Sequence, residues 1–184
     1  MFGVYRDKLC FFLLSTMSLI LITFSAWSAP AKHKVLPLLE GFEWELSVED
    51  FQSLPDDTYL TLIEIASDPT LLAFYRGRAQ VALSLYKNEK VWGYFENSIE
   101  GALSQSEKRR ALEGICEVFI HTRSDALKDL LRPELQNEDI RFRVISAQCL
   151  RDLQAQESDP ITDIALKQYE KSIIVDWERQ QFKR

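Results

Sequence analysis

Paired arginines recur along this sequence and are its residues best suited to binding chemistry. The pairs are Arg76 with Arg78, Arg109 with Arg110, and Arg141 with Arg143. A guanidinium group presents a planar fork of donors that fits carboxylate and phosphate groups. The recurrence fits a basic ridge that grips acidic side chains or phosphate, with Arg76, Arg109 and Arg141 as candidate partner-binding residues. It also fits a ladder of ion pairs with acids of adjacent units, which we favour; the acids near enough in sequence are Glu107, Glu113 and Asp139.

Two cysteines could form a covalent link. Cys116 and Cys149 occupy equivalent positions in successive units of the repeat described below. In an exported protein such a pair invites a disulfide. Adjacent packed helices, however, have axes about 8–10 Å apart, and a disulfide needs Cα atoms within about 7 Å. We therefore expect two buried thiols.

The sequence contains no recognisable catalytic or metal-binding set. His33 and His121 have no partners at the spacing of zinc ligands. A nucleophile motif, a glycine-rich phosphate loop and a convincing carboxylate pair are also absent from the sequence. We expect a protein that is not an enzyme and has no cofactor. The alternative is an enzyme whose site lies between helices, which would need polar groups converging in a pocket from separate repeats.

Aromatic residues near the start of the domain offer a different kind of site. Phe42, Trp44 and Phe51 would form a docking site if they were exposed together. We favour their folding back as an N-terminal cap over the first helix pair, and keep Phe42 and Trp44 as candidate partner-binding residues. Trp92 and Phe95 are expected in the core.

Charge and composition limit the classes of partner. The 184 residues contain 22 Lys and Arg against 28 Asp and Glu, a net charge of −6. This balance does not suit a general nucleic-acid binder, and it disfavours binding to an anionic membrane surface. A protein partner remains, with membrane contact only through an uncleaved N-terminal segment.

The first 28 residues resemble a secretory leader. Arg6 and Lys8 precede an uncharged apolar run from Leu9 to Ala31, and Ala26-Trp27-Ser28 offers a small-residue cleavage site. The alternative is a retained single-pass anchor, because about 18 apolar residues can span a bilayer. Cleavage makes the chain periplasmic or secreted; retention leaves it anchored in the inner membrane with its domain outside the cytoplasm. Residues 29–46 are expected to be a linker, mobile in its first part, before a domain over 47–184.

Apolar residues recur at helical spacing through the domain, and no stretch alternates as a strand would. Ser47, Asp57, Ser106 and Asp159 are expected to cap helices. The last predicted helix runs from Ile161 to about Gln181, and its apolar stripe consists of Ile161, Ala165, Tyr169, Ile173 and Trp177.

One phrase repeats in the second helix of successive pairs. Arg78-Ala79-Gln80-Val81-Ala82-Leu83 returns at Arg110 and again, at nearly the same spacing, at Arg143. A small residue at Ala82, Gly114 and Ala147 would let these helices approach their neighbours closely, and stacking would bury faces that one pair cannot bury alone. We expect Ala82→Arg to unfold the stack and Arg76→Ala to leave folding nearly intact.

The pattern resembles the HEAT-repeat family. The matching residues are Leu62, Ile65, Asp68, Pro69, Arg78, Ala79, Ala82 and Leu83, then Arg110, Ala111, Gly114 and Ile115, then Leu127, Leu130, Leu131, Asn137, Arg143, Val144 and Ala147. The resemblance implies an all-α superhelix of about three antiparallel helix pairs, with capping helices at both ends. It also implies a role in holding proteins, and no reaction.

These observations lead to an expected function. The chain is expected to be an exported, non-enzymatic scaffold or adaptor that binds another protein, in the bacterial envelope, with its second helices forming the concave face. The alternatives are a membrane-tethered structural subunit of an envelope complex, and the enzyme with a site between helices.

The fate of the leader is directly testable. We expect the intact mass of the protein from a bacterial envelope fraction to correspond to a chain that begins at Ala29. A mass that still includes residues 1–28 would contradict cleavage and favour the membrane-tethered alternative.

Overall fold

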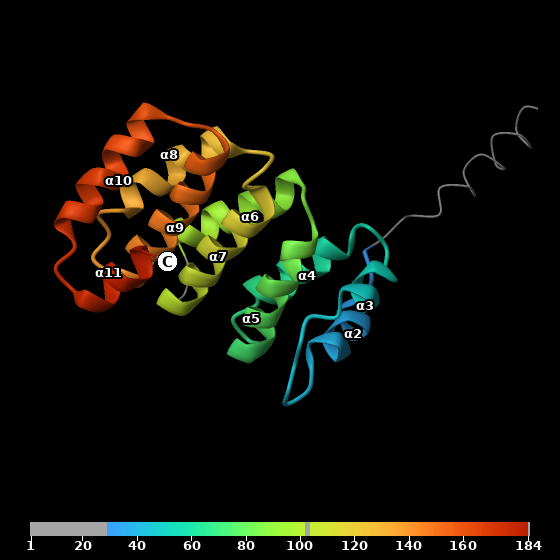
Figure 1. Cartoon of the computed structure of the whole chain (residues 1–184). Helices are drawn as coiled ribbons and strands as arrows, with labels where there is room; N and C mark the ends of the chain where they lie inside the picture. Colours follow the sequence, from blue (N-terminus) through green and yellow to red (C-terminus); the bar gives the residue numbers. More distant parts are fainter. Residues whose placement is uncertain (1–28, 102–103, 184) are drawn as a thin grey trace, which may run out of the picture.

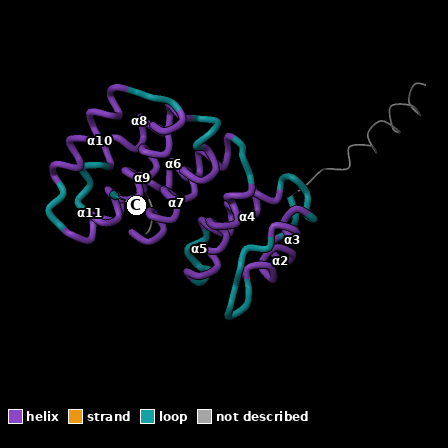
Figure 2. The backbone as a smooth tube through the Cα atoms, in the orientation of Figure 1, coloured by secondary structure: helices purple, strands orange, loops and turns teal. Residues whose placement is uncertain are grey.

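The computed structural model describes residues 29–101 and 104–183, so the predicted leader lies outside the described residues. The described part of the chain is entirely helical outside its turns (Figure 2). The helices are α2 Lys32–Val35, η1 Leu36–Leu39, α3 Val48–Gln52, α4 Thr58–Ser67, α5 Ala73–Ala82, η2 Leu83–Leu85, α6 Glu89–Gly101, α7 Gln105–Phe119, α8 Ser124–Glu134, α9 Ile140–Gln156, α10 Pro160–Ser172 and α11 Asp176–Phe182.

The helices form antiparallel pairs that pack in chain order (Figure 1). α4 pairs with α5, α6 with α7, and α8 with α9, while α10 and α11 both pack on α9. The second helices α5, α7 and α9 contact one another in sequence and connect the pairs. This arrangement confirms the predicted all-α fold and is consistent with a small superhelical array.

Polar caps set the start of several helices. The hydroxyl of Ser47 accepts from Asp50 N, as predicted, and Asp159 accepts from two backbone N–H groups at the start of α10. α7 begins earlier than expected, because Ser104, and not Ser106, accepts from Glu107 N. Asp57 precedes α4 without a side-chain cap bond. Each cap bond satisfies a donor that the helix itself leaves unpaired.

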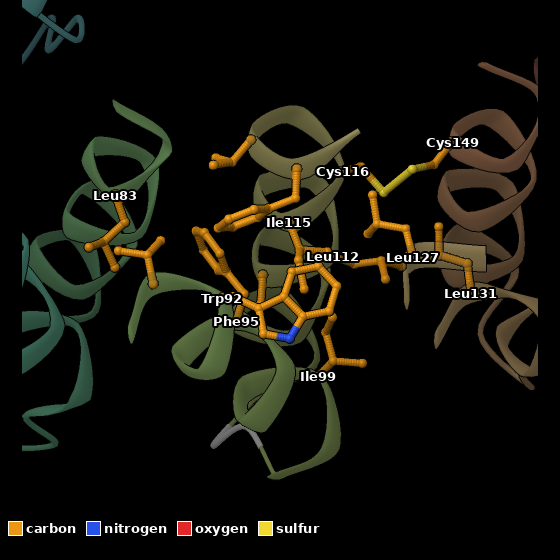
Figure 3. Packing of buried hydrophobic residues seen from close by; sticks show 14 of the residues in the cluster. Leu83, Trp92, Phe95, Ile99, Leu112, Ile115, Cys116, Leu127, Leu131 and Cys149 are labelled. Atoms are coloured by element: carbon orange, nitrogen blue, oxygen red, sulfur yellow. A yellow bond between two sulfur atoms is a disulfide. The ribbon is translucent and has the colours of Figure 1, made fainter. Parts of the chain in front are cut away.

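Small residues in the repeated phrase allow the predicted close packing. Ala82, Gly114 and Ala147 are all buried. A Cβ atom at Gly114 would lie 2.8 Å from the Phe95 ring, closer than real Cβ atoms approach such a ring. Leu83, Ile115 and the rings of Trp92 and Phe95 fill the surrounding layer (Figure 3). The predictions for this layer, including core positions for both aromatic residues, are confirmed.

The predicted mobile linker is instead a packed part of the domain. Val35 and Leu39 have no exposed surface, because α2 and η1 lie against α4 and α5. Thr61 donates to the carbonyl oxygen of Pro30 at 2.6 Å. The Nζ atom of Lys32 lies 2.9 Å from Glu64 and 3.0 Å from Asp68. The basic residues of this segment led us to predict a solvated linker. Its apolar residues Val35 and Leu39 are buried instead and attach it to the domain.

The prediction of a single long helix at the C-terminus is also wrong. The chain leaves the helical conformation at Ile173, whose ψ is 114°, and returns as the separate helix α11. Three β-branched residues at 173–175 favour an extended backbone here. The turn lets α11 pack on α9. Of the predicted stripe, Ile161 at the start of α10 is 64% exposed and Trp177 in α11 is 46% exposed.

A disulfide joins Cys116 of α7 to Cys149 of α9, against our expectation of two thiols (Figure 3). Their Cα atoms are 6.1 Å apart. Cα atoms lie on a cylinder of radius about 2.3 Å around each helix axis. Two residues that face each other across packed helices are therefore several ångströms closer than the axes, which is within disulfide reach. The axis distance was the wrong measure for this pair.

The disulfide should contribute substantially to stability. Its reduction should lower the free energy of unfolding by about 3 to 4 kcal/mol, because the bridge closes a long loop of the chain. Urea denaturation of the purified protein with and without a reductant measures this difference. A variant with both Cys116→Ala and Cys149→Ala should show no further effect of reductant. Two titratable thiols in the untreated protein would contradict the bridge.

Candidate functional site

The recurring arginines mostly hold the stack together. Arg76 contacts Glu107 at 2.8 Å, and Arg109 contacts Asp139 at 3.2 Å. A third bridge joins Arg143 to Glu178 at 2.8 Å. Each links the second helix of one pair to residues of the next, so the favoured ladder interpretation is confirmed for Glu107 and Asp139.

Two positions of the ladder differ from the prediction. Glu113 is exposed, and the third acid is Glu178, which the sequence did not suggest because it lay within the supposed long final helix. Arg143 makes the third bridge, while Arg141 is exposed at the start of α9. Of the three candidate arginines, Arg76 and Arg109 are therefore engaged within the fold.

The third bridge surrounds an almost completely buried carboxylate. Glu178 is 1% exposed, and both its oxygens accept from Arg143, at 2.8 and 2.9 Å. The hydroxyl of Tyr169 donates to the same carboxylate at 2.9 Å. Burial alone would raise the pKa of Glu178, but the hydrogen bonds from Arg143 and Tyr169 lower it below its usual value. Burial and the neighbouring carboxylate raise the pKa of the Tyr169 hydroxyl.

The first bridge, between Arg76 and Glu107, also pairs a buried carboxylate with an arginine. Glu107 is 5% exposed, and its carboxylate accepts from Arg76 at 2.8 Å and from the Ser104 hydroxyl at 2.9 Å. Burial opposes ionisation, yet these two hydrogen bonds lower the pKa of Glu107 below its usual value. The buried Gln80 completes the network: it donates to the Glu107 carbonyl oxygen and accepts from Arg110.

A groove of about 640 Å³ lies between α4 and α6, beside the hydrogen-bond network of Glu107 and Gln80. Apolar residues of α4, including Leu60 and Ile63, form one wall, and Gly93 of α6 leaves open space on the other. Polar groups of Gln80 and Glu107 reach it from α5 and α7. This is the kind of pocket that the enzyme alternative requires, but these polar groups are already engaged with neighbouring side chains.

The histidines lie apart from each other. His33 is exposed in α2, and Nδ1 of His121 lies 2.9 Å from Oε1 of Gln156. Within residues 29–101 and 104–183, no group of three or more metal-ligating side chains is placed to hold an ion. In the same part of the chain, no helix combines the length and apolar character needed to cross a bilayer.

The aromatic candidates divide between core and surface. Phe51 is 2% exposed and packs in the core, as the cap interpretation predicts. Trp44 is partly buried, and its indole N–H donates to the Leu38 carbonyl oxygen at 2.8 Å. Phe42 is fully exposed, at the turn where Gly41 adopts a φ of 106°. This positive φ favours glycine, and the turn directs the Phe42 side chain into solvent.

Arg78 fixes the position of this turn. Its guanidinium donates to the carbonyl oxygens of Leu39 at 2.7 Å and Gly41 at 2.8 Å. The same group lies 5.3 Å from the centre of the Trp44 ring and 5.0 Å from that of Phe74. Cation–π contacts of this kind hold the arginine between the two rings. One residue of α5 thus fixes both the backbone and an aromatic side chain of the turn.

Exposed apolar residues of α5 continue the surface around Phe42. Phe74 is 43% exposed and lines a shallow hollow with Phe42 and Arg78. Val81, two turns further along the same helix face, is 40% exposed. We call Phe42, Trp44, Phe74, Arg78 and Val81 the Phe42 patch. The sequence pointed to Phe42 and Trp44; the residues from α5 were missed because they lie inside the repeated phrase or just before it.

Comparison with known proteins identifies no family. The sequence matches no family model and no curated protein, and the structure matches no solved structure. The fold is therefore described by its own geometry, as an all-helical domain with sequential contacts between helix pairs.

The geometry of the first bridge changes the expectation for Arg76→Ala. This substitution should now lower the free energy of unfolding by about 2 kcal/mol, because it leaves the buried Glu107 carboxylate without its cation. The exposed Arg141→Ala is the matched control and should change stability by less than about 0.5 kcal/mol.

The pH dependence provides a second readout. The lowered pKa of Glu107 means that its ionised form stabilises the fold above the usual pKa of 4.5, and that this stability is lost as the pH falls through the lower folded value. The difference between wild type and Arg76→Ala should therefore shrink below about pH 4.5. Urea denaturation of both proteins at pH 7 and pH 3.5 measures this difference in the free energy of unfolding. Equal destabilisation by Arg76→Ala and Arg141→Ala at pH 7 would contradict the ladder of ion pairs.

Proposed function

We propose that this chain is an exported, non-enzymatic helical-repeat adaptor of the bacterial envelope that binds another protein through the Phe42 patch. The observation that carries the proposal is that Phe42 is fully exposed at a turn that hydrogen bonds fix in place. A flexible tail would also expose an aromatic residue, but here α5 supports the turn through Arg78. The resemblance to HEAT repeats, which implies a role in holding proteins, supports the same conclusion.

The energetics of the patch favour protein binding. Burying a Phe side chain contributes about 1.5 to 3 kcal/mol relative to leaving it in water. Aromatic residues and arginine are also the side chains that most often dominate binding energy in interfaces. Because Arg78 already orders the turn, little conformational entropy remains to be lost on association. A partner with an apolar pocket would therefore gain most of the burial energy.

The proposed compartment has two kinds of support. The disulfide between Cys116 and Cys149 is consistent with an oxidising environment. The apolar run before Ala29, with its small-residue cleavage site, is typical of an exported chain. A membrane-tethered subunit would present the same patch, so this alternative changes the attachment and not the binding surface.

The ion pairs disfavour the arginine ridge as the contact. Arg76 and Arg109 lie in bridges between helix pairs, so a partner would have to compete with Glu107 or Asp139 for them. The Phe42 patch needs no such rearrangement.

Site-specific photocrosslinking tests the proposal. A benzophenone amino acid in place of Phe42 should give a discrete crosslinked species with another protein when the chain is expressed in the periplasm and irradiated. The same group in place of Ile174, which is 89% exposed between α10 and α11 at the other end of the stack (Figure 1), is the matched control. We expect crosslinking at least fivefold stronger at position 42. Equal yields at the two positions, or none at position 42, would refute the Phe42 patch as the binding site.

A further inference from the structure

We propose that the protein surface that receives Phe42 is basic, with Lys and Arg side chains around an apolar pocket. This inference rests on the proposed function and specifies the chemistry of the partner. It follows from the charges that surround the Phe42 patch.

The segment that carries Phe42 is strongly acidic. Residues 40–57 contain seven acidic side chains and no Lys, Arg or His. The acids are Glu40, Glu43, Glu45, Glu49, Asp50, Asp56 and Asp57. All except Asp57 are exposed. With Lys32 and Lys34 included, residues 29–57 have two basic and seven acidic side chains, a net charge of −5, so this end of the domain is acidic.

Two of these acids flank the aromatic residues directly. Glu43 lies between Phe42 and Trp44, and Glu45 follows Trp44. Within the described residues, neither forms an ion pair with a basic side chain. Glu40 lines the hollow beside Phe42 and accepts from the Tyr75 hydroxyl at 3.0 Å. The apolar surface thus has an acidic rim, which consists of Glu40, Glu43 and Glu45.

One cation, Arg78, contacts the patch, and its single positive charge offsets only part of the charge of Glu40, Glu43 and Glu45. The Arg78 guanidinium donates to two backbone carbonyl oxygens and lies over the rings of Trp44 and Phe74, and it forms no ion pair with the described acids. A partner therefore meets an aromatic side chain that projects from a negative surface. Complementary positive charge would accelerate the encounter and select against other surfaces.

The same charges disfavour the other occupants of such a patch. A second copy of this chain would bring an equally acidic rim against the first, and like charges across an interface oppose association. An anionic membrane and a nucleic acid are repelled for the same reason. A basic protein surface with an apolar pocket would both bury Phe42 and attract the acidic side chains around it.

Two helical peptides of equal length serve as probes. One has an apolar face of Leu bordered by Lys, and the other has the same Leu positions bordered by Glu. Fluorescence anisotropy measures their binding to the exported protein at low ionic strength and at 0.5 M NaCl. We expect the Leu–Lys peptide to bind at least tenfold more tightly than the Leu–Glu peptide, and to weaken at least tenfold at high salt because the exposed charges are screened.

Matched variants separate the rim from the overall charge. Glu43→Lys with Glu45→Lys should weaken the Leu–Lys peptide at least tenfold. Glu113→Lys with Glu117→Lys changes the net charge equally at exposed positions of α7 and should weaken it less than about threefold. Phe42→Ala should also weaken binding, which places the peptide on the patch.

Three results would overturn the inference. They are equal weakening by the two charge-reversal pairs, equal binding of the two peptides, or no binding of the Leu–Lys peptide at low salt. None of these affects the photocrosslinking result. A discrete crosslink at position 42 combined with any of them would retain the adaptor function and reject the basic partner.

Discussion

Paired burial of arginine and carboxylate groups between successive helix pairs is the interaction on which this structure depends. Glu107 and Glu178 are almost fully buried, and each is stabilised by an arginine from the preceding second helix. A buried carboxylate without a cation would be strongly unfavourable. The bridges therefore form only when neighbouring pairs stack in the correct register, and they add specificity to an apolar interface that could slide.

The middle of the stack is connected by a different combination of contacts. Between α7 and α9, the bridge from Arg109 to Asp139 is more exposed than the other two, and the disulfide from Cys116 to Cys149 lies in the same interface. Exposed ion pairs contribute little to stability, whereas a disulfide restricts the unfolded chain. The covalent bond is thus placed where the ion pair is least protected from water. This combination is effective only where disulfides persist, which agrees with an exported protein.

Local sequence patterns predicted the helix pairs and the small residues between them, because both depend on neighbours that recur at fixed spacing. Gly114 against Phe95 is one such contact. The errors arose where distant contacts outweighed local preference. Residues 29–39 look like a basic linker, yet Val35 and Leu39 fill the end of the core. The stripe from Ile161 to Trp177 looks like one helix, yet the chain turns and places Glu178 beside Arg143. The patch was only half predicted, because exposure of Phe42 depends on Arg78, which belongs to a later helix and is distant in the sequence.

One position of the repeated phrase explains how a structural element can also support binding. Arg143 in the third copy forms a buried ion pair, and Arg110 in the second donates to Gln80. Arg78 holds this position in the first copy, and its partners are η1 and the Gly41 turn rather than another helix pair. It therefore directs its donors to backbone carbonyl oxygens and orders a surface turn. The end of a repeat array frees such a position from its role between units, and here the freed arginine holds an exposed aromatic residue in place.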